Sequence, residues 1–245
     1  IDGIELHHKK SKNTFYRLFG NKNIIEPAIN KKSIDNNFFE IIHTEDKIKG
    51  EDTAFAAAKR GKNTSMWLAI ESVKNKTSDI IISAGNTGAL LVIAKLNLKM
   101  IENIDKPALS ALWPNKKGMS VVLDLGANIE CSEKNLIDFS EMGSALYRSL
   151  FPNEEVKVSL LNIGSEELKG TEVLKNAYSK LKTLENMGDF KFVGYVEGNQ
   201  ITSNISNVIV TDGFTGNVAL KTAEGTANFI IKELKNTFTS SILGK

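Results

Sequence analysis

The sequence has few of the residues that bind metals or cross-link a chain. There is one cysteine, Cys131, and there are three histidines among 245 residues. A single cysteine excludes an internal disulfide and a four-cysteine zinc site. His7, His8 and His43 show no metal-binding spacing with carboxylates or with Cys131. We therefore expect no metal site and no cofactor, and we interpret Cys131 as a small, partly buried residue that follows a strand.

Long apolar runs are also missing. No stretch approaches the roughly 20 apolar residues that span a bilayer, and no secretory signal is visible. The net charge of +2 is too small to indicate nucleic acid as a partner. These features predict a cytoplasmic protein. A length of 245 residues fits one large domain, which we expect to be incomplete at both ends because the sequence starts at Ile1 and stops at Lys245 within a helical pattern.

Three common motifs of α/β enzymes are absent. There is no G-x-x-x-x-G-K-[ST], which argues against a P-loop nucleotide hydrolase. No G-x-G-x-x-G is followed by an acidic residue about 20 positions later, so a dinucleotide-binding fold of the usual kind is disfavoured. The absence of a G-x-S-x-G elbow weighs against an α/β-hydrolase. Transfer to or from phosphate remains, because that chemistry needs orientation and charge stabilisation rather than a metal cage or a dedicated nucleophile.

What the sequence does contain is an alternation of strands and helices. Apolar, β-branched stretches predict strands at residues 14–19, 38–43, 80–82, 107–113, 119–125, 155–163, 190–196 and 207–211. Helical patterns occur at residues 24–32, 52–60, 64–73, 89–95, 133–146, 171–181 and from 218 onward. Most strands are apolar throughout rather than alternating in polarity. This pattern is typical of a doubly wound α/β fold, with a mostly parallel sheet covered on both faces.

Residues 80–91 combine a strand, a turn and a helix in a way that suits anion binding. Ile80, Ile81 and Ile82 favour a buried strand, residues 83–88 are small and turn-forming, and a helical run follows from Ala89. The free backbone N–H groups at the start of a helix can hold a phosphate. The alternative is an ordinary tight turn that binds nothing.

Four loops share this composition, at residues 83–88, 124–128, 162–170 and 212–217. Each follows a predicted strand and is rich in Gly, Asn, Asp, Ser or Thr. Ligands of open α/β sheets bind at the carboxyl ends of the strands, so the four loops together predict a polar cleft that accepts anions. A basic cluster at residues 59–62 is either a solvated helix end or a contact for phosphate or an acidic partner.

Longer segments of the sequence carry more specific information than these short patterns. The segments are Ser-Ala-Gly-Asn-Thr-Gly-Ala-Leu at 83–90, Val-Leu-Asp-Leu-Gly-Ala-Asn at 122–128, Leu-Asn-Ile-Gly-Ser-Glu-Glu-Leu-Lys-Gly at 161–170 and Thr-Asp-Gly-Phe-Thr-Gly-Asn-Val-Ala-Leu-Lys-Thr at 211–222. In this order they closely resemble motifs of the bacterial PlsX-type phosphate acyltransferases. The resemblance covers roughly residues 51–235.

The resemblance implies a fold similar to that of isocitrate and isopropylmalate dehydrogenases and of phosphotransacetylases. It implies an enzyme that transfers a fatty acyl group from acyl-[acyl-carrier protein] to inorganic phosphate, giving acyl phosphate for phospholipid synthesis. It also implies a homodimer that associates peripherally with the inner face of the cell membrane. Two alternatives stay open: phosphotransacetylase-like transfer between coenzyme A thioesters and phosphate, and a non-catalytic phosphate- or nucleotide-binding module.

On this hypothesis, phosphate lies against the amides of the first loop, and the side chains of Asn86 and Thr87 donate hydrogen bonds to it. Backbone donors of residues 213–216, with Asn217, contact the oxyanion. Lys221, one helical turn beyond Asn217, neutralises phosphate charge or assists the leaving thiolate, unless it is simply a solvated lysine. The predicted catalytic residues are Asn217, Lys221 and Asp212, and the predicted phosphate- and substrate-binding residues are Ser83, Gly85, Asn86, Thr87, Gly88, Asp124, Asn128, Gly213, Thr215 and Gly216.

The two aspartates of this set, Asp124 and Asp212, have two alternative roles. They either position Lys221 or cap their own loops. The stretch between Ala227 and Leu243 also has two interpretations, because its apolar residues share one helical face. It is either a core or dimer contact, or a helix on the membrane surface as the resemblance suggests.

Overall fold

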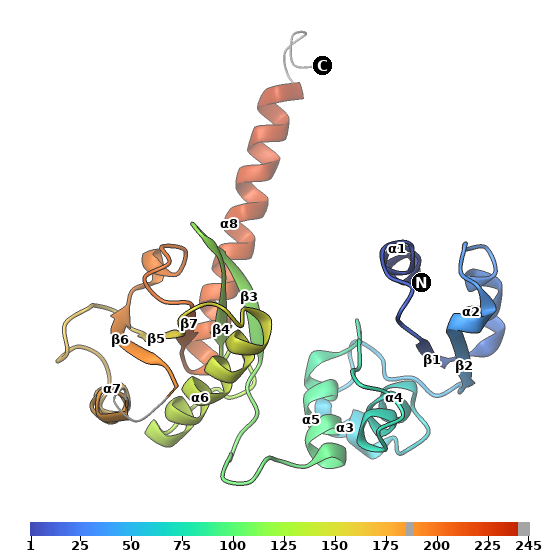
Figure 1. Cartoon of the computed structure of the whole chain (residues 1–245), viewed down its shortest axis with the longest axis horizontal. Coiled ribbons are helices and arrows are strands. Elements are labelled where there is room, and N and C mark those ends of the chain that lie inside the picture. The colour runs from blue at the N-terminus through green and yellow to red at the C-terminus, as the bar shows by residue number, and fades with distance from the viewer. Residues whose placement is uncertain (185–188, 240–245) are drawn as a thin grey trace. The chain divides into compact units, whose positions relative to one another are not determined.

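The computed structural model describes residues 1–184 and 189–239. The chain forms two compact units, Ile1–Ile101 and Glu102–Lys245, and each is described by itself (Figure 1). The expectation of a single domain stays a prediction.

The first unit contains a small sheet and a group of helices. Strands β1 (Tyr16–Gly20) and β2 (Phe39–His43) pair in parallel. Three helices around one core, α3 (Ala54–Lys59), α4 (Ser65–Lys74) and α5 (Thr87–Leu98), bury Ala57, Met66, Ile70, Ala89 and Ile93. The other helices are α1 (Asp2–Lys10), which was not predicted, α2 (Lys22–Ile29) and the 3-10 turn η1 (Asn36–Phe38).

The predicted strand at residues 80–82 is wrong. The segment forms no strand, and among the described residues of this unit β1 and β2 pair only with each other. Ile80 is 74% exposed and Ile82 is 90% exposed, while Ile81 packs against the core of α3, α4 and α5. Branched side chains favour a strand only where a neighbouring strand supplies contacts and hydrogen bonds. That neighbour is lacking in the described part of the unit.

The second unit is built on a five-stranded sheet with the order β3-β4-β7-β5-β6. Its strands are β3 (Ser110–Asn115), β4 (Gly118–Leu123), β5 (Lys157–Leu161), β6 (Lys191–Val196) and β7 (Val208–Val210). β3 runs antiparallel to β4, and the remaining pairs are parallel. The prediction of a mostly parallel sheet is therefore confirmed. Because β7 lies between β4 and β5, the loops after these three strands leave the same edge as neighbours.

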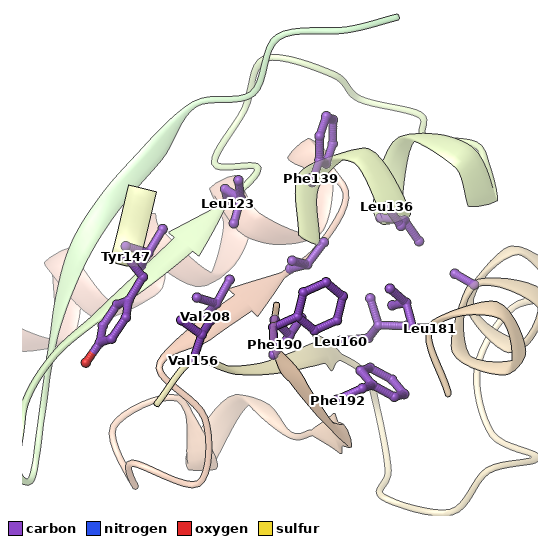
Figure 2. Packing of buried hydrophobic residues seen from close by; sticks show 14 of the residues in the cluster. Leu123, Leu136, Phe139, Tyr147, Val156, Leu160, Leu181, Phe190, Phe192 and Val208 are labelled. Carbon is purple, nitrogen blue, oxygen red and sulfur yellow. The ribbon is translucent and has the colours of Figure 1, made fainter. Parts of the chain in front are cut away.

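Helices cover both faces of this sheet, as predicted. α6 (Glu133–Leu150) and α7 (Glu172–Leu184) pack on one face. The first turns of α8 (Gly213–Thr239) pack on the other face. A short 3-10 turn, η2 (Gly198–Gln200), follows β6 in the sequence. Successive residues of β4 alternate between the two cores, as a pleated strand requires. Figure 2 shows Leu160 and Val208 of the sheet in one cluster with Phe139 and Leu181 of the helices.

Helix α8 begins at Gly213 rather than at 218, so the predicted loop at residues 212–217 is mostly helix. From Glu224 to Thr239 every residue is exposed, and Figure 1 shows this part of α8 projecting from its sheet. Core packing is thus not seen for residues 227–239, the dimer and membrane interpretations stay predictions, and residues 240–243 lie outside the described residues. Among the helices described, none has the length and apolar character needed to cross a membrane.

Candidate active site

The first candidate site is the start of α5. Asn86 is its N-cap, and the Oδ1 atom accepts a hydrogen bond from the Ala89 amide at 2.9 Å. The next two amides, of Thr87 and Gly88, have no partner among the described residues, and both residues are exposed. Amides at this position point out of the helix along its axis. The arrangement expected of an anion-binding helix start is therefore present, although the strand expected before it is not.

The side chain of Asn86 holds another part of the chain. Its Nδ2 atom donates to the carbonyl oxygens of Gly50 at 2.9 Å and Asp52 at 2.8 Å. A side-chain amide has two N–H bonds, so in this structure Asn86 has no further donor for phosphate. Ser83 also acts inside the loop, since its Oγ accepts from the Gly85 amide at 3.2 Å. The exposed Thr87 hydroxyl has no partner among the described side chains and remains available.

An ion pair that the sequence did not reveal fixes the segment held by Asn86. The two terminal nitrogens of Arg60 contact the two carboxylate oxygens of Asp52, each at 2.9 Å. The same guanidinium donates to the Lys47 carbonyl at 3.0 Å. The Asp52 side chain is only 11% exposed, and two-point charge-assisted pairing holds a carboxylate in one plane. Within the basic cluster at residues 59–62, Arg60 therefore supports the loop beside α5.

In the second unit, Asp124 organises the loop that follows β4. It is fully buried, and its carboxylate accepts five hydrogen bonds of 2.7–3.1 Å. The donors are the amides of Leu109, Gly126, Ala127 and Asn128, and the side chain of Asn128. A buried carboxylate is tolerated when such donors replace water. Of the two roles left open for Asp124, the structure shows the loop-capping one.

Asn128 connects this loop to the start of α8. Its Nδ2 donates to the Pro107 carbonyl at 2.7 Å, and its own carbonyl accepts from the Gly213 amide at 2.8 Å. A Cβ atom on Gly213 would lie 2.6 Å from that carbonyl oxygen, and one on Gly216 would lie 1.9 Å from the Asp124 carbonyl oxygen. Both positions thus require glycine, because the helix start and the loop touch backbone to backbone.

Asp212 caps α8. Its Oδ1 accepts from the Thr215 amide and its Oδ2 from the Thr215 hydroxyl, each at 2.8 Å. The amides of Gly213, Thr215 and Gly216 all donate within the chain, whereas that of Phe214 has no partner among the described residues. Of the four backbone donors predicted for the oxyanion, the structure therefore leaves the Phe214 amide available.

The remaining two predicted catalytic residues lie further along α8. Asn217 donates through Nδ2 to the Leu125 carbonyl at 3.2 Å, against the backbone of Gly126, which has a φ of 132°. Lys221 is 64% exposed at its side chain and pairs with Glu224 at 2.8 Å. Among the described residues, Lys221 contacts neither of the two aspartates that were suggested to position it.

Cys131 lies beside the same helix start. Its Sγ is 3.8 Å from the Asn128 carbonyl oxygen. Burial raises the pKa of the Cys131 thiol, and the backbone N–H of Gly213 acts against that shift. The Cys131 side chain is partly buried and packs against the core beneath α6, so the interpretation as a small, partly buried residue is confirmed. Lys106, which is not among the predicted site residues, donates to the Glu130 carbonyl at 3.0 Å and places a cation at this edge.

The loop at residues 162–170 is closed by its own bonds. Asn162 donates to the Lys169 carbonyl at 3.0 Å and accepts from the Ile163 amide at 2.8 Å. At Gly170, which has a φ of 96°, a Cβ would lie 2.7 Å from the Asn162 side chain. No group of three or more His, Cys, Asp or Glu residues in the described ranges is placed to hold a metal.

The fold resembles that of two solved structures. The EutD phosphotransacetylase from Staphylococcus aureus superposes with a TM-score of 0.62, covering 91% of this chain and 77% of that one at 13% identity. A branched-chain phosphotransacylase from Enterococcus faecalis gives a TM-score of 0.50 over 79% of this chain and 70% of that one, at 15% identity. At these identities the likeness shows the fold alone, which confirms the predicted phosphotransacetylase-like fold.

Sequence comparison identifies the family. The model of the family described as fatty acid synthesis protein matches residues 1–245. A phosphate acyltransferase of Pelagibacter ubique is 67% identical over 245 residues, which are 100% of this chain and 73% of that protein. The chain belongs to this fatty acid synthesis family. The predicted resemblance to phosphate acyltransferases is confirmed.

Proposed function

We propose that this protein transfers a fatty acyl group from acyl-[acyl-carrier protein] to inorganic phosphate, producing acyl phosphate for phospholipid synthesis. The observation that carries the proposal is the exposed pair of amides at Thr87 and Gly88, which have no partner in the described part of the chain and lie on a helix start fixed by Asn86. Family membership supplies the reaction, since the relative from Pelagibacter ubique is a phosphate acyltransferase. A helix start of this kind favours a phosphate oxyanion through both hydrogen bonds and the helix dipole.

The chemical step needs little from the protein beyond positioning. Phosphate attacks the thioester carbonyl, so that a C–O bond forms and, after a tetrahedral intermediate, the C–S bond breaks. The released thiolate takes a proton to become the thiol of the carrier protein. Phosphate is already a nucleophile at neutral pH, and each backbone donor aimed at the oxyanion contributes about 3 kcal/mol to the barrier reduction.

Within this proposal the residues around α8 stabilise charge. The free amide of Phe214 is the candidate oxyanion donor, and Asn217 and Asp212 hold the helix start that presents it. Lys221 is the candidate cation for the phosphate or the leaving thiolate. Its ion pair with Glu224 is exposed. Exposed ion pairs contribute little to stability, so breaking this pair to bind a substrate costs little free energy.

The experiment is acyl phosphate formation by the full-length protein and by its Asn86→Ala and Asn217→Ala variants. We expect both variants to lose at least tenfold in kcat/KM, because each removes a side chain that holds a helix start in place. Wild-type turnover in both variants would end the assignment of these residues. Ligand binding without any acyl phosphate from the wild type would favour a non-catalytic phosphate-binding module.

The acyl donor is decided by a second assay. The alternative donor that the sequence analysis left open is a coenzyme A thioester. Acyl-[acyl-carrier protein] and acyl-coenzyme A of the same chain length are compared side by side. We expect the higher kcat/KM with the carrier protein, and the reverse order would assign a phosphotransacetylase-like enzyme.

We propose further that the protein acts as a homodimer in the cytoplasm and contacts the inner face of the cell membrane peripherally. The support is α8, whose residues from Glu224 onward are exposed. Five large apolar side chains lie in that part, at Phe229, Ile230, Ile231, Leu234 and Phe238. Side chains of this kind favour burial against a second surface.

A further inference from the structure

The carboxyl edge of the five-stranded sheet carries large apolar side chains that do not belong to either core. They are Ile129 (72% exposed), Ile163 (81%), Leu168 (86%), Phe214 (62%) and Val218 (52%). They lie on the segments that follow β4, β5 and β7, which are adjacent in the sheet. We call these five residues the apolar edge.

Backbone contacts bring the members of the apolar edge together. The Gly213 amide donates to the Asn128 carbonyl at 2.8 Å, so the next residues, Phe214 and Ile129, start from touching backbones. Val218 follows Phe214 by one helical turn and shares its face of α8. The apolar edge therefore lies around the helix start that presents the free Phe214 amide.

The β5 loop adds the other two members. β5 and β7 are parallel neighbours with Leu160 opposite Val210, so the segments that follow them, with Ile163 and Gly213, leave the same edge of the sheet. The bond from Asn162 to the Lys169 carbonyl at 3.0 Å folds the loop back, and this fixes the segment that contains Leu168.

The apolar edge contributes little to the stability of the loops that carry it. These loops are held by polar contacts, through the Asp124 carboxylate, the Asn162 side chain and the Asp212 cap. A set of exposed large apolar side chains beside a polar site is typical of a surface that binds a ligand.

We propose that the apolar edge binds the hydrocarbon chain of the acyl substrate. This inference rests on the proposed function and adds the subsite that recognises a long acyl chain. The substrate is polar at the thioester and apolar along its chain. This edge of the sheet presents both characters, with the Phe214 amide for the carbonyl oxygen and five exposed apolar side chains on the segments at the same edge. Each methylene removed from water improves binding by roughly fourfold, so the edge selects long chains over short ones.

The experiment measures chain-length preference in the full-length protein. kcat/KM is determined with butyryl- and palmitoyl-[acyl-carrier protein] for the wild type and for the double variant Ile163→Ser/Leu168→Ser. We expect the variant to lose at least tenfold with the palmitoyl donor and less than threefold with the butyryl donor. The matched control is Ile205→Ser, which removes an apolar side chain that is 44% exposed before β7, at the opposite edge of the sheet. The control should keep the wild-type ratio between the two donors.

An equal loss with both donors would overturn the proposal, because it would show that the apolar edge supports folding, or contacts another protein surface, instead of the acyl chain. Wild-type kcat/KM values with both donors would overturn it as well. A Val218→Ser variant gives an independent readout from α8 and should shift the ratio in the same direction. Absence of acyl phosphate from the wild type with every donor would instead refute the proposed function, so the two failures are distinguishable.

Discussion

At the scale of single residues, most of the polar side chains predicted to bind substrate form hydrogen bonds with main-chain groups of the protein itself. Asn86, Asp124 and Asn217 each direct their polar atoms to main-chain groups. In these loops the backbone amides of Thr87, Gly88 and Phe214 have no partner among the described residues. Residue types led to the prediction of these loops as a site, but they did not show which of their polar atoms already have hydrogen-bond partners, because those partners lie far away in the sequence.

Arg60 gives the first prediction at this scale. Arg60→Gln removes the two-point contact to Asp52 and loosens the segment that Asn86 holds. We expect the KM for phosphate to rise about tenfold, the effect of losing roughly one charged hydrogen bond, with kcat changed less than threefold. Steady-state kinetics of the full-length protein at varied phosphate measure this. Lys62→Gln, an exposed change in the same basic cluster, is the control, and an unchanged phosphate KM in Arg60→Gln would contradict the prediction.

Tyr147 gives a prediction about pH. Burial, together with the hydrogen bond that its hydroxyl donates to Glu154 at 2.5 Å, raises the pKa of Tyr147 to about 12. An unfolded tyrosine titrates near pH ~10, so at higher pH the unfolded chain loses a proton that the folded chain keeps. The stabilisation is complete below pH ~10 and is lost as the pH rises toward 12. Urea unfolding over this range should show a steeper loss for the wild type than for Tyr147→Phe, and parallel curves would contradict this.

At the scale of elements, the sequence predicted most strands and helices because their periodicity reflects burial. The strands of the five-stranded sheet and helices α4 to α7 fall where the apolar pattern placed them. Two errors have one origin. Residues 80–82 lack a partner strand, and α8 starts at Gly213 because Asp212 caps it against the loop of Asp124. Both features depend on contacts between distant segments, which local patterns do not contain.

Two glycines of α8 give a matched prediction with opposite signs. At Gly216 a Cβ would lie 1.9 Å from the Asp124 carbonyl oxygen, whereas at Gly225 nothing lies within 4 Å. Gly216→Ala should therefore lower the free energy of unfolding by about 1–3 kcal/mol or more, through overpacking. Gly225→Ala should raise it by about 0.5–1 kcal/mol, since alanine is the better helix former. Urea unfolding of both variants tests the pair, and equal effects would refute the packing described for the helix start.

At the scale of the whole molecule, the exposed part of α8 gives a prediction about association. Ile231→Glu and Phe238→Glu place charges among its apolar residues. Liposome flotation of the full-length protein should fall several-fold, because a buried charge is strongly disfavoured at a membrane surface. Asn236→Glu, a charge at an exposed polar position of the same helix, is the control. Unchanged flotation together with a change from dimer to monomer would assign this surface to the dimer contact instead.

The exposed isoleucines before α5 also bear on the solubility of the protein. Ile80 and Ile82 are 74% and 90% exposed in a run of three uncharged, β-branched residues. Such runs promote stacking between molecules, and a neighbouring charge hinders it. Here that charge is Asp79, directly before the run. We therefore expect the solubility of the protein to depend in part on this single carboxylate, which lies beside the segment that leads into the proposed phosphate-binding loop.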